Sequence, residues 1–366
     1  MRDRALLQLI FTLDYEIHGN GEGSPYELMV EPTRRMLDQF DRHGARLTIL
    51  ADVAEILKFK EYAETNGRDD FHYHAIASQL QDAIRRGHDV QLHLHSSWFN
   101  ARYEDQRWIH DWSEYDFARL PIERMEAYVR TGKDYLESLL RPVDSRYRCT
   151  AFRAANWSMH PSRNAMDVLR KNGFVIESSV FKWGSRSGLV DFDYSHAPHT
   201  LLPWRASVDD VCREDPQSGI WEFPIYTERR WIGTFLSPNR LYRAWLGRMH
   251  PLPRDFTNGA KELGSEAPVP VTKPRTRRGW LTGHPWKADF NQCTGRQLIG
   301  AVDRAGRLVD GKSSELAPFV MIGHSKLFTP ANERSLERFL RYAASRKQEM
   351  RFATFGEASE SLRNLH

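Results

Sequence analysis

Short apolar runs alternate with amphipathic helical stretches along most of this chain, and this alternation constrains its fold more than any other feature. ALLQLIFTL, RLTIL and DVQLHLH have strand character, and they are separated or followed by stretches with helical periodicity, such as 31–43, 73–87 and 121–140. Repeated β–α units imply parallel strands joined by helical crossovers. Roughly seven such units favour a closed or nearly closed barrel over an open sheet, although both architectures share this alternation.

We expect a single barrel domain over residues 1–366, with one insertion. The segment from about 252 to 290 interrupts the alternation, because it is rich in Pro, Gly and basic residues and has no period. A solvated insertion is the favoured interpretation. The alternative is a lid or a loop that binds an anionic substrate, since the segment carries Lys273, Arg275, Arg277 and Arg278.

Composition excludes several classes of protein. The 52 basic residues are nearly matched by 48 acidic ones, so we expect no nucleic-acid partner. The longest apolar runs are too short to cross a bilayer, so we expect no transmembrane segment, and the first run is predicted to be a strand and not a signal peptide. The three scattered cysteines form neither a disulfide framework nor a zinc-ribbon spacing. These features predict a cytoplasmic protein in which any metal is bound by histidine and carboxylate side chains.

Unusual polar residues fall where the predicted strands end. In parallel barrels the loops after the carboxyl ends of the strands carry the chemistry. The strand-end residues are Asp14, Glu16, His93, His95, Arg153, Glu177 and His324. Their placement predicts a functional site at this end of the barrel.

Two pairs of these residues have the spacing of a strand. Asp14 and Glu16 are two apart, as are His93 and His95, so each pair is expected to point to one side. Carboxylate and imidazole groups together supply the ligands that zinc and similar divalent ions accept. One carboxylate can bind the ion while the other takes a proton from water. The alternative is a set of ordinary strand-end residues that cap helices or pair with arginine.

Two further strand-end residues can serve the same site. Arg153 can hold the free carboxylate as a partner, which would orient it and keep it ionised. His324 can act as a general acid if neighbouring groups raise its pKa. A structural salt bridge and a surface histidine are the respective alternatives.

Five motifs resemble, in type and in order, those of the polysaccharide deacetylase superfamily, the NodB-type group of carbohydrate esterase family four. They are FTLDYE, RRGHDVQLHLHSSW, TAFRAANW, GFVIESSV and MIGHSK. The resemblance extends from about residue 6 to 358, without the insertion. It implies an α/β fold, a distorted (β/α)7 TIM-like barrel. It also implies metal-assisted hydrolysis of an N- or O-acetyl group on a sugar.

The resemblance assigns roles to individual residues. It implies that Asp14 is the catalytic base, that Arg153 is its partner and that His324 is the general acid. Glu16 takes the place of the family's metal-binding acid, and His93 matches its first metal-binding histidine.

The sequence departs from the family pattern at two of these positions. Asp-Tyr-Glu replaces the usual Asp-Asp pair, and Ser97 stands where the second metal-binding histidine is expected. His95, two residues after His93, is therefore expected to replace that histidine. The predicted cofactor is one divalent ion, zinc, with cobalt or nickel as alternatives.

We therefore predict a deacetylase whose partner is a carbohydrate, either a surface polysaccharide or its precursor, including nucleotide-linked and lipid-linked glycans. Asn156, Trp98 and Trp157 follow the predicted strands and are candidates for substrate binding, with core packing as the alternative for the tryptophans. Two other functions stay open. The same fold and metal could act on another acyl group or C–N bond, or the barrel could be catalytically silent and bind a glycan or a partner protein.

Overall fold

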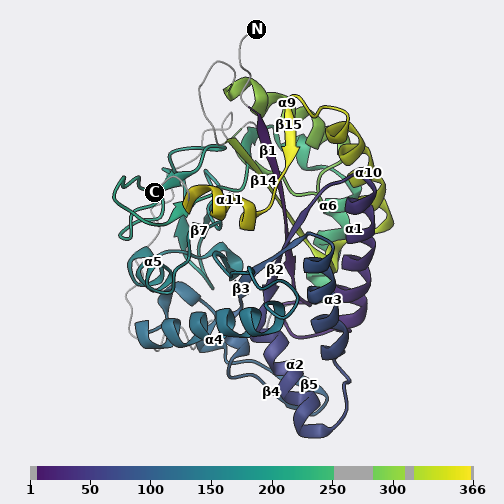
Figure 1. Cartoon of the computed structure of the whole chain (residues 1–366), viewed down its shortest axis with the longest axis vertical. Coiled ribbons are helices and arrows are strands. Elements are labelled where there is room, and N and C mark those ends of the chain that lie inside the picture. The colour runs from purple at the N-terminus through teal and green to yellow at the C-terminus, as the bar shows by residue number, and fades with distance from the viewer. Residues whose placement is uncertain (1–5, 251–282, 310–316, 364–366) are drawn as a thin grey trace.

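The computed structural model describes residues 6–250, 283–309 and 317–363. Within these ranges the chain forms one curled sheet surrounded by helices (Figure 1). The strands of this sheet are β1 (Leu7–Tyr15), β2 (Leu47–Asp52), β3 (Asp89–Leu94), β6 (Ala151–Ala154), β7 (Ile176–Glu177), β10 (Trp204–Arg205), β11 (Trp221–Glu222), β14 (Ala317–His324) and β15 (Met350–Phe352). The α-helices are α1 (Glu31–Arg42), α2 (Val53–Asn66), α3 (Tyr73–Arg85), α4 (Ile122–Leu140), α5 (Ser162–Lys171), α6 (Pro238–Met249), α9 (Gly295–Val309), α10 (Pro330–Ala344) and α11 (Phe355–Arg363).

The sheet has the order β10-β11-β7-β6-β3-β2-β1-β14, and β15 pairs with the beginning of β1. Every neighbouring pair from β11 to β14 is parallel, and only β10 runs antiparallel to its neighbour. All residues of β1 and β14 are buried, as expected for parallel strands that are covered on both faces. The predicted α/β class and its parallel strands are thus confirmed.

The barrel closes through the residues that follow β11. The Ile225 N–H donates to the carbonyl of Val180, which lies just after β7, at 2.9 Å. The next N–H, that of Tyr226, donates to the Val320 carbonyl of β14 at 3.0 Å. The segment with Ile225 and Tyr226 therefore connects the end of β7 to β14 by hydrogen bonds. It stands where a seventh strand would close the sheet, which fits the expected distorted (β/α)7 barrel.

Three two-stranded antiparallel sheets accompany the main sheet in the described ranges. They are β4 (Arg102–Glu104) with β5 (Arg107–Ile109), β8 (Ser185–Arg186) with β9 (Phe192–Asp193), and β12 (Thr227–Arg230) with β13 (His284–Lys287). The insertion expected over about 252–290 lies outside the described residues as far as 282. Its last part is described and belongs to the folded barrel, since β13 contributes the fully buried Trp286 and Asp289 forms a bridge with Ile322 of β14.

Helices cover the outside of the barrel and one of its ends. Gly132 brings α4 close to β3, because a Cβ atom there would lie 2.7 Å from Leu92 Cδ1. The Phe355 and Gly356 N–H groups at the start of α11 donate to Thr48 Oγ1 and Asp89 Oδ2, which lie where β2 and β3 begin. The last helix therefore closes the amino-terminal end of the barrel and leaves the carboxyl ends of the strands open.

The helices at 31–43 and 121–140 are confirmed to within two residues, whereas α2 was not predicted. None of the helices in the described ranges is both long and apolar enough to span a bilayer.

Candidate active site

Strand register brings the predicted site residues to one level at the carboxyl end of the barrel. Asp14 of β1 lies opposite His324 of β14, and His93 of β3 lies opposite both Asp52 of β2 and Arg153 of β6. These five side chains come from neighbouring parallel strands, so their carboxyl ends meet at the same edge. The strand-end rule applied to the sequence therefore identified residues that are neighbours in space.

Asp14 and Arg153 form a buried ion pair. Arg153 is 0 % exposed, and its Nη1 atom lies 2.8 Å from Asp14 Oδ1. The guanidinium also donates to Thr12 Oγ1 at 2.8 Å and to the Ser178 carbonyl at 2.7 Å, which fixes its orientation. Burial raises the pKa of Asp14, but Arg153, His93 and His324 outweigh burial and hold it below its ordinary value. Asp14 is therefore an ionised, oriented carboxylate at neutral pH.

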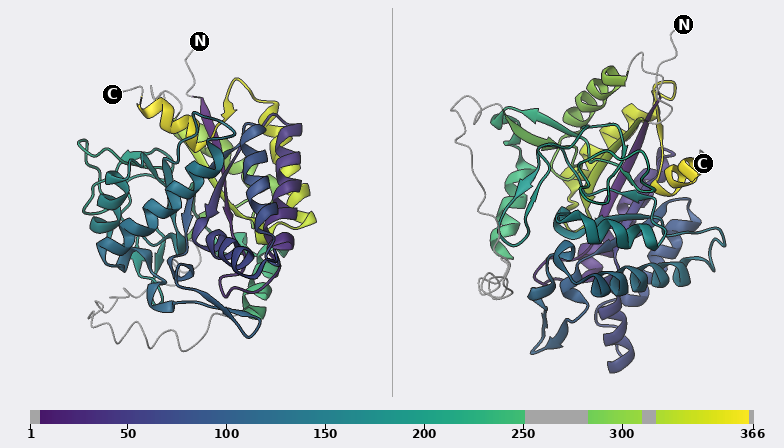
Figure 2. Two further views of the ribbon diagram at one scale, coloured as in Figure 1. Left: turned by 60° about the horizontal axis from the view of Figure 1, so that its bottom comes forward. Right: turned by 90° about the vertical axis from the view of Figure 1, so that its left-hand side faces the viewer.

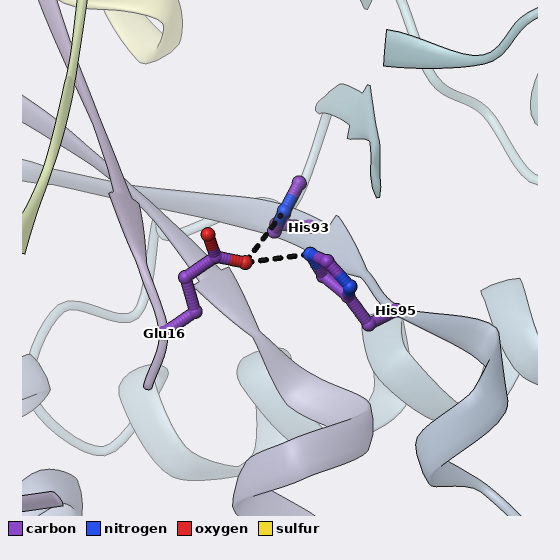
Figure 3. Close-up of side chains that lie close together, drawn as sticks. All are labelled: Glu16, His93 and His95. Atoms are coloured by element: carbon purple, nitrogen blue, oxygen red, sulfur yellow. Dashed lines mark ion pairs between the residues drawn. The ribbon is translucent and has the colours of Figure 1, made fainter. Parts of the chain in front are cut away.

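Glu16, His93 and His95 form a second cluster beside this pair (Figure 3). The Glu16 Oε2 atom lies 2.6 Å from His95 Nε2 and 3.5 Å from His93 Nε2. One ligand atom from each residue lies within 4.8 Å of the other two, so the three could hold a metal ion. His95 remains in extended backbone conformation one residue past the end of β3, which explains why both imidazoles turn to the same side.

The orientation of His93 suits a metal ligand. Its Nδ1 atom lies 2.9 Å from the carbonyl oxygen of Arg153, an acceptor, so Nδ1 carries the proton and Nε2 faces Glu16. Metal-binding histidines commonly have such a partner on the other ring nitrogen. Burial lowers the pKa of His93, but Glu16 and Asp14 outweigh burial and raise it to about 9. Cation binding at His93 must therefore release a proton at neutral pH.

Two further residues of the cluster were not predicted. Asp52 is 0 % exposed, and its Oδ1 atom accepts the backbone N–H of His95 at 3.1 Å, which holds that residue in place. Lys326 donates to Glu16 Oε1 at 2.8 Å and to the Ile17 carbonyl at 2.7 Å. Asp52 ends its strand in RLTILAD and so follows the same strand-end rule, whereas nothing in the sequence singles out Lys326 beyond its place two residues after His324.

Lys326 divides the two oxygens of Glu16 between different partners. Glu16 Oε1 pairs with the Lys326 ammonium group, and Glu16 Oε2 faces the imidazoles of His93 and His95. Burial raises the pKa of Glu16, but Lys326, His95 and His93 together lower it well below its ordinary value. Glu16 is therefore ionised and has one oxygen directed towards the histidines.

His324 faces both carboxylates, with its Nε2 atom 3.5 Å from Asp14 Oδ2 and 3.9 Å from Glu16 Oε1. Burial lowers the pKa of His324 to about 4, and the two carboxylates do not offset it. We expected His324 to act as a general acid if its neighbours raised its pKa above the ordinary value, and they do not. His324 is neutral at pH 7 and must receive a proton before it can donate one.

A cavity of about 570 Å³ opens onto these groups. Asp14, Glu16, His93, His95 and His324 all line it. Ser97, which stands at the position of the family's second histidine, does not line the cavity and is 2 % exposed in a short 3₁₀ turn.

The three residues expected to bind substrate differ in position. Asn156 and Trp157 line the cavity, whereas Trp98 does not. Asn156 accepts hydrogen bonds from Tyr115 and Arg186 at its Oδ1 atom, and its buried Nδ2 group has no partner among the described residues. It therefore has a free donor. Trp98 is 1 % exposed and packs against other aromatic rings, including Phe59, Trp108 and His110. Because core packing explains it, we leave Trp98 out of the substrate site.

No protein-family model and no curated protein matches this chain by sequence. Solved structures do resemble it. A Mycobacterium smegmatis protein assigned as a polysaccharide deacetylase has a TM-score of 0.50 at 13 % sequence identity, with 100 % of this chain and 93 % of that chain covered. A Pseudomonas aeruginosa PAO1 protein with the same assignment has a TM-score of 0.46 at 15 % identity, with 99 % and 92 % covered. A Puue allantoinase has a TM-score of 0.46 at 14 % identity, with 99 % and 92 % covered.

Proposed function

From the premise that this chain has the polysaccharide deacetylase fold, we propose that it is a metal-dependent hydrolase that removes an N- or O-linked acetyl group from a sugar. One observation carries the proposal. The three-ligand cluster and Asp14, a separate carboxylate paired with the buried Arg153, line the same cavity. Hydrolysis at a metal centre needs both parts, because the groups that hold the ion cannot also remove the proton from water.

Glu16, His93 and His95 would hold the cation. Three protein ligands leave positions open for water and substrate, which is the arrangement of catalytic and not of structural zinc sites. The mixture of imidazole and carboxylate donors suits zinc, and cobalt or nickel would fit the same ligands. When bound, the cation polarises the acyl carbonyl and lowers the pKa of water.

The remaining residues move the protons and orient the sugar. Asp14 accepts a proton from the attacking water, and Arg153 keeps its carboxylate ionised and directed into the cavity. Asp14 Oδ2 and His324 Nε2 are 3.5 Å apart, so the proton can pass to the neutral imidazole and then to the leaving nitrogen or oxygen as the acyl bond breaks. The Asn156 amide and the Trp157 ring contribute a hydrogen bond and a stacking surface for the sugar.

The test combines metal content with acetate release. We expect about one equivalent of divalent cation in the purified or reconstituted protein, and acetate release from an acetylated oligosaccharide. Glu16→Gln and His95→Gln should each lower both cation affinity and turnover at least about tenfold. His199→Gln is the matched control, because His199 is an exposed histidine paired with Glu214, and it should change neither.

The outcomes separate this function from its alternatives. A bound cation with release of a different acyl or amine product would replace the deacetylase by another hydrolase of the same fold. Absence of both cation and turnover, with retained glycan binding, would favour a catalytically silent barrel. An unchanged cation affinity in the His95→Gln variant would refute the assignment of the third ligand.

A further inference from the structure

The helix α6 and the turn before it carry most of the exposed apolar side chains in the described structure. Six of the eight large hydrophobic residues that are exposed lie between 231 and 249. They are Trp231 (59 %), Leu236 (78 %), Leu241 (64 %), Tyr242 (42 %), Trp245 (54 %) and Met249 (56 %). We call these six residues the α6 apolar face. Such concentration is uncommon on a soluble surface and marks a site of contact.

The spacing along α6 separates this face from the active site. Leu241, Trp245 and Met249 are four residues apart and therefore lie along one side of the helix, next to Tyr242. Arg243, Leu246 and His250 fall on the neighbouring side and line the cavity of the candidate site. One helix thus presents apolar side chains to the exterior and Arg243, Leu246 and His250 to the cavity. The right-hand view of Figure 2 shows the segment of α6 at the edge of the molecule.

The charge of this segment has a single sign. Residues 229–250 include no acidic side chain, but they include Arg229, Arg230, Arg240, Arg243 and Arg248. Arg248 is exposed in the last turn of α6. A helix with arginine beside tryptophan, tyrosine and leucine is typical of helices that lie in the interface of an anionic membrane. Charge complementarity excludes a basic partner, and the tryptophan, leucine and methionine side chains exposed beside these arginines favour an anionic lipid surface over an acidic protein.

The cavity itself also favours an anion. Besides the groups of the candidate centre, Arg186 and Arg243 line it. Guanidinium groups match phosphate geometry with paired hydrogen bonds, and a neutral acetylated sugar needs no such pair. Arg243 lies on the side of α6 that faces the cavity, where its Nη1 atom is 3.6 Å from Asp289 Oδ2. A phosphate group at Arg243 would therefore lie in the cavity beside the sugar site, on the same helix that carries the exposed hydrophobic surface.

Building on the proposed hydrolase, we infer that the α6 apolar face docks onto a membrane surface with anionic headgroups and that the substrate is a saccharide joined to a lipid through phosphate. The sugar occupies the cavity, the phosphate meets Arg243 and Arg186, and the lipid remains in the bilayer beside α6. Each of the three chemical parts of such a molecule then has a binding group in the cavity or on α6.

Vesicle co-sedimentation of the full chain tests the docking surface. We expect binding to phosphatidylcholine vesicles that contain phosphatidylglycerol and much weaker binding to phosphatidylcholine alone. Leu241→Ser and Trp245→Ser should each lower the partition coefficient roughly tenfold, because each removes a large apolar side chain from the interface. Arg248→Glu should lower binding only to the anionic vesicles. Leu308→Ser and Arg146→Glu are matched controls, since both residues are exposed outside this segment.

Fluorescence quenching and light scattering show whether lipid or a second copy of the chain covers the α6 apolar face. Brominated lipid should quench tryptophan fluorescence, and the Trp245→Phe variant should show less quenching. Equal binding of all variants, or no preference for anionic vesicles, overturns the inference. So does a light-scattering mass that falls from dimer to monomer in Trp245→Ser without any vesicle binding, because the face would then be covered by a second copy.

Deacetylation assays on two substrates test the membrane-docking inference separately from the proposed hydrolase function. The Leu241→Ser and Trp245→Ser variants should deacetylate a water-soluble oligosaccharide as the unmodified protein does, while their turnover of a lipid-phosphate-linked acetylated sugar in vesicles falls in parallel with vesicle binding. Vesicle binding without any deacetylation would refute the hydrolase. Deacetylation of both substrates unaffected by the variants would refute the membrane surface.

Discussion

Replacing Arg153 by methionine tests the buried ion pair on which the proposed chemistry depends. The guanidinium is fully buried, lies 2.8 Å from Asp14 and makes further hydrogen bonds to Thr12 and Ser178. Methionine is also long and unbranched, but it has no charge and no donor. Removal of one partner from a buried pair leaves the other charge uncompensated and destabilises by about 3–5 kcal/mol. We expect a loss of this size in the free energy of unfolding of Arg153→Met.

Urea unfolding of Arg153→Met, Asp14→Asn and the double variant measures this coupling. The double variant should be more stable than the sum of the single losses predicts, because it no longer contains an unpaired buried carboxylate. Arg163→Met is the control. Its ion pair with Asp209 is exposed on the arginine side, so its loss should cost no more than about 1 kcal/mol.

The dependence on pH has a definite sign. In the unmodified protein the pKa of Asp14 is below its ordinary value, so the stability it contributes is present above about pH 4 and is lost as the pH falls through the folded-state pKa. Without Arg153, burial should raise the pKa of Asp14 above its unfolded value. The variant is then most destabilised at neutral pH and approaches the unmodified protein in acid.

Two results would refute this reasoning. One is a loss of less than about 1 kcal/mol in Arg153→Met at pH 7, since exposed pairs have that magnitude. The other is additivity of the two single losses to within about 0.5 kcal/mol, which would mean that the two side chains are not coupled.

Three further predictions concern the proton, the cation and acid stability. Asp14→Asn should lower turnover at least about a hundredfold while the bound cation, measured by elemental analysis, is retained; loss of the cation would contradict the role of base. Lys326→Met should raise cation affinity roughly tenfold in chelator competition, because it removes the ammonium 2.8 Å from Glu16 Oε1, and weaker binding would show that Lys326 supports the site instead. Burial lowers the pKa of His88 to about 4, against an ordinary value of 6.5, so the protein should lose up to about 3 kcal/mol of stability as the pH falls from about 6.5 to 4, and His88→Gln should lose less; equal pH slopes in thermal unfolding would exclude His88 as the cause.

The sequence predicted the parts of the fold that depend on local periodicity. A helix repeats every 3.6 residues and a strand every two, so helices such as α1 and α4 were located to within two residues. The helix α2 was missed because its apolar residues do not form one clear stripe. The closure of the barrel could not be predicted, since it depends on hydrogen bonds such as those from Ile225 and Tyr226 to Val180 and Val320, which are far away in the sequence.

By itself the sequence determined that Asp14, Glu16, His93, His95, Arg153 and His324 stand at strand ends, and parallel strands bring such ends together. Only the tertiary structure decided what each of them contacts. Packing placed Trp157 in the cavity and Trp98 in the core, although both follow a strand. Register across the sheet brought Asp52 to the backbone of His95, and Lys326 reached Glu16 through the β14 loop. Which side chains become partners depends on the distances between strands, and these distances are fixed only when the barrel folds.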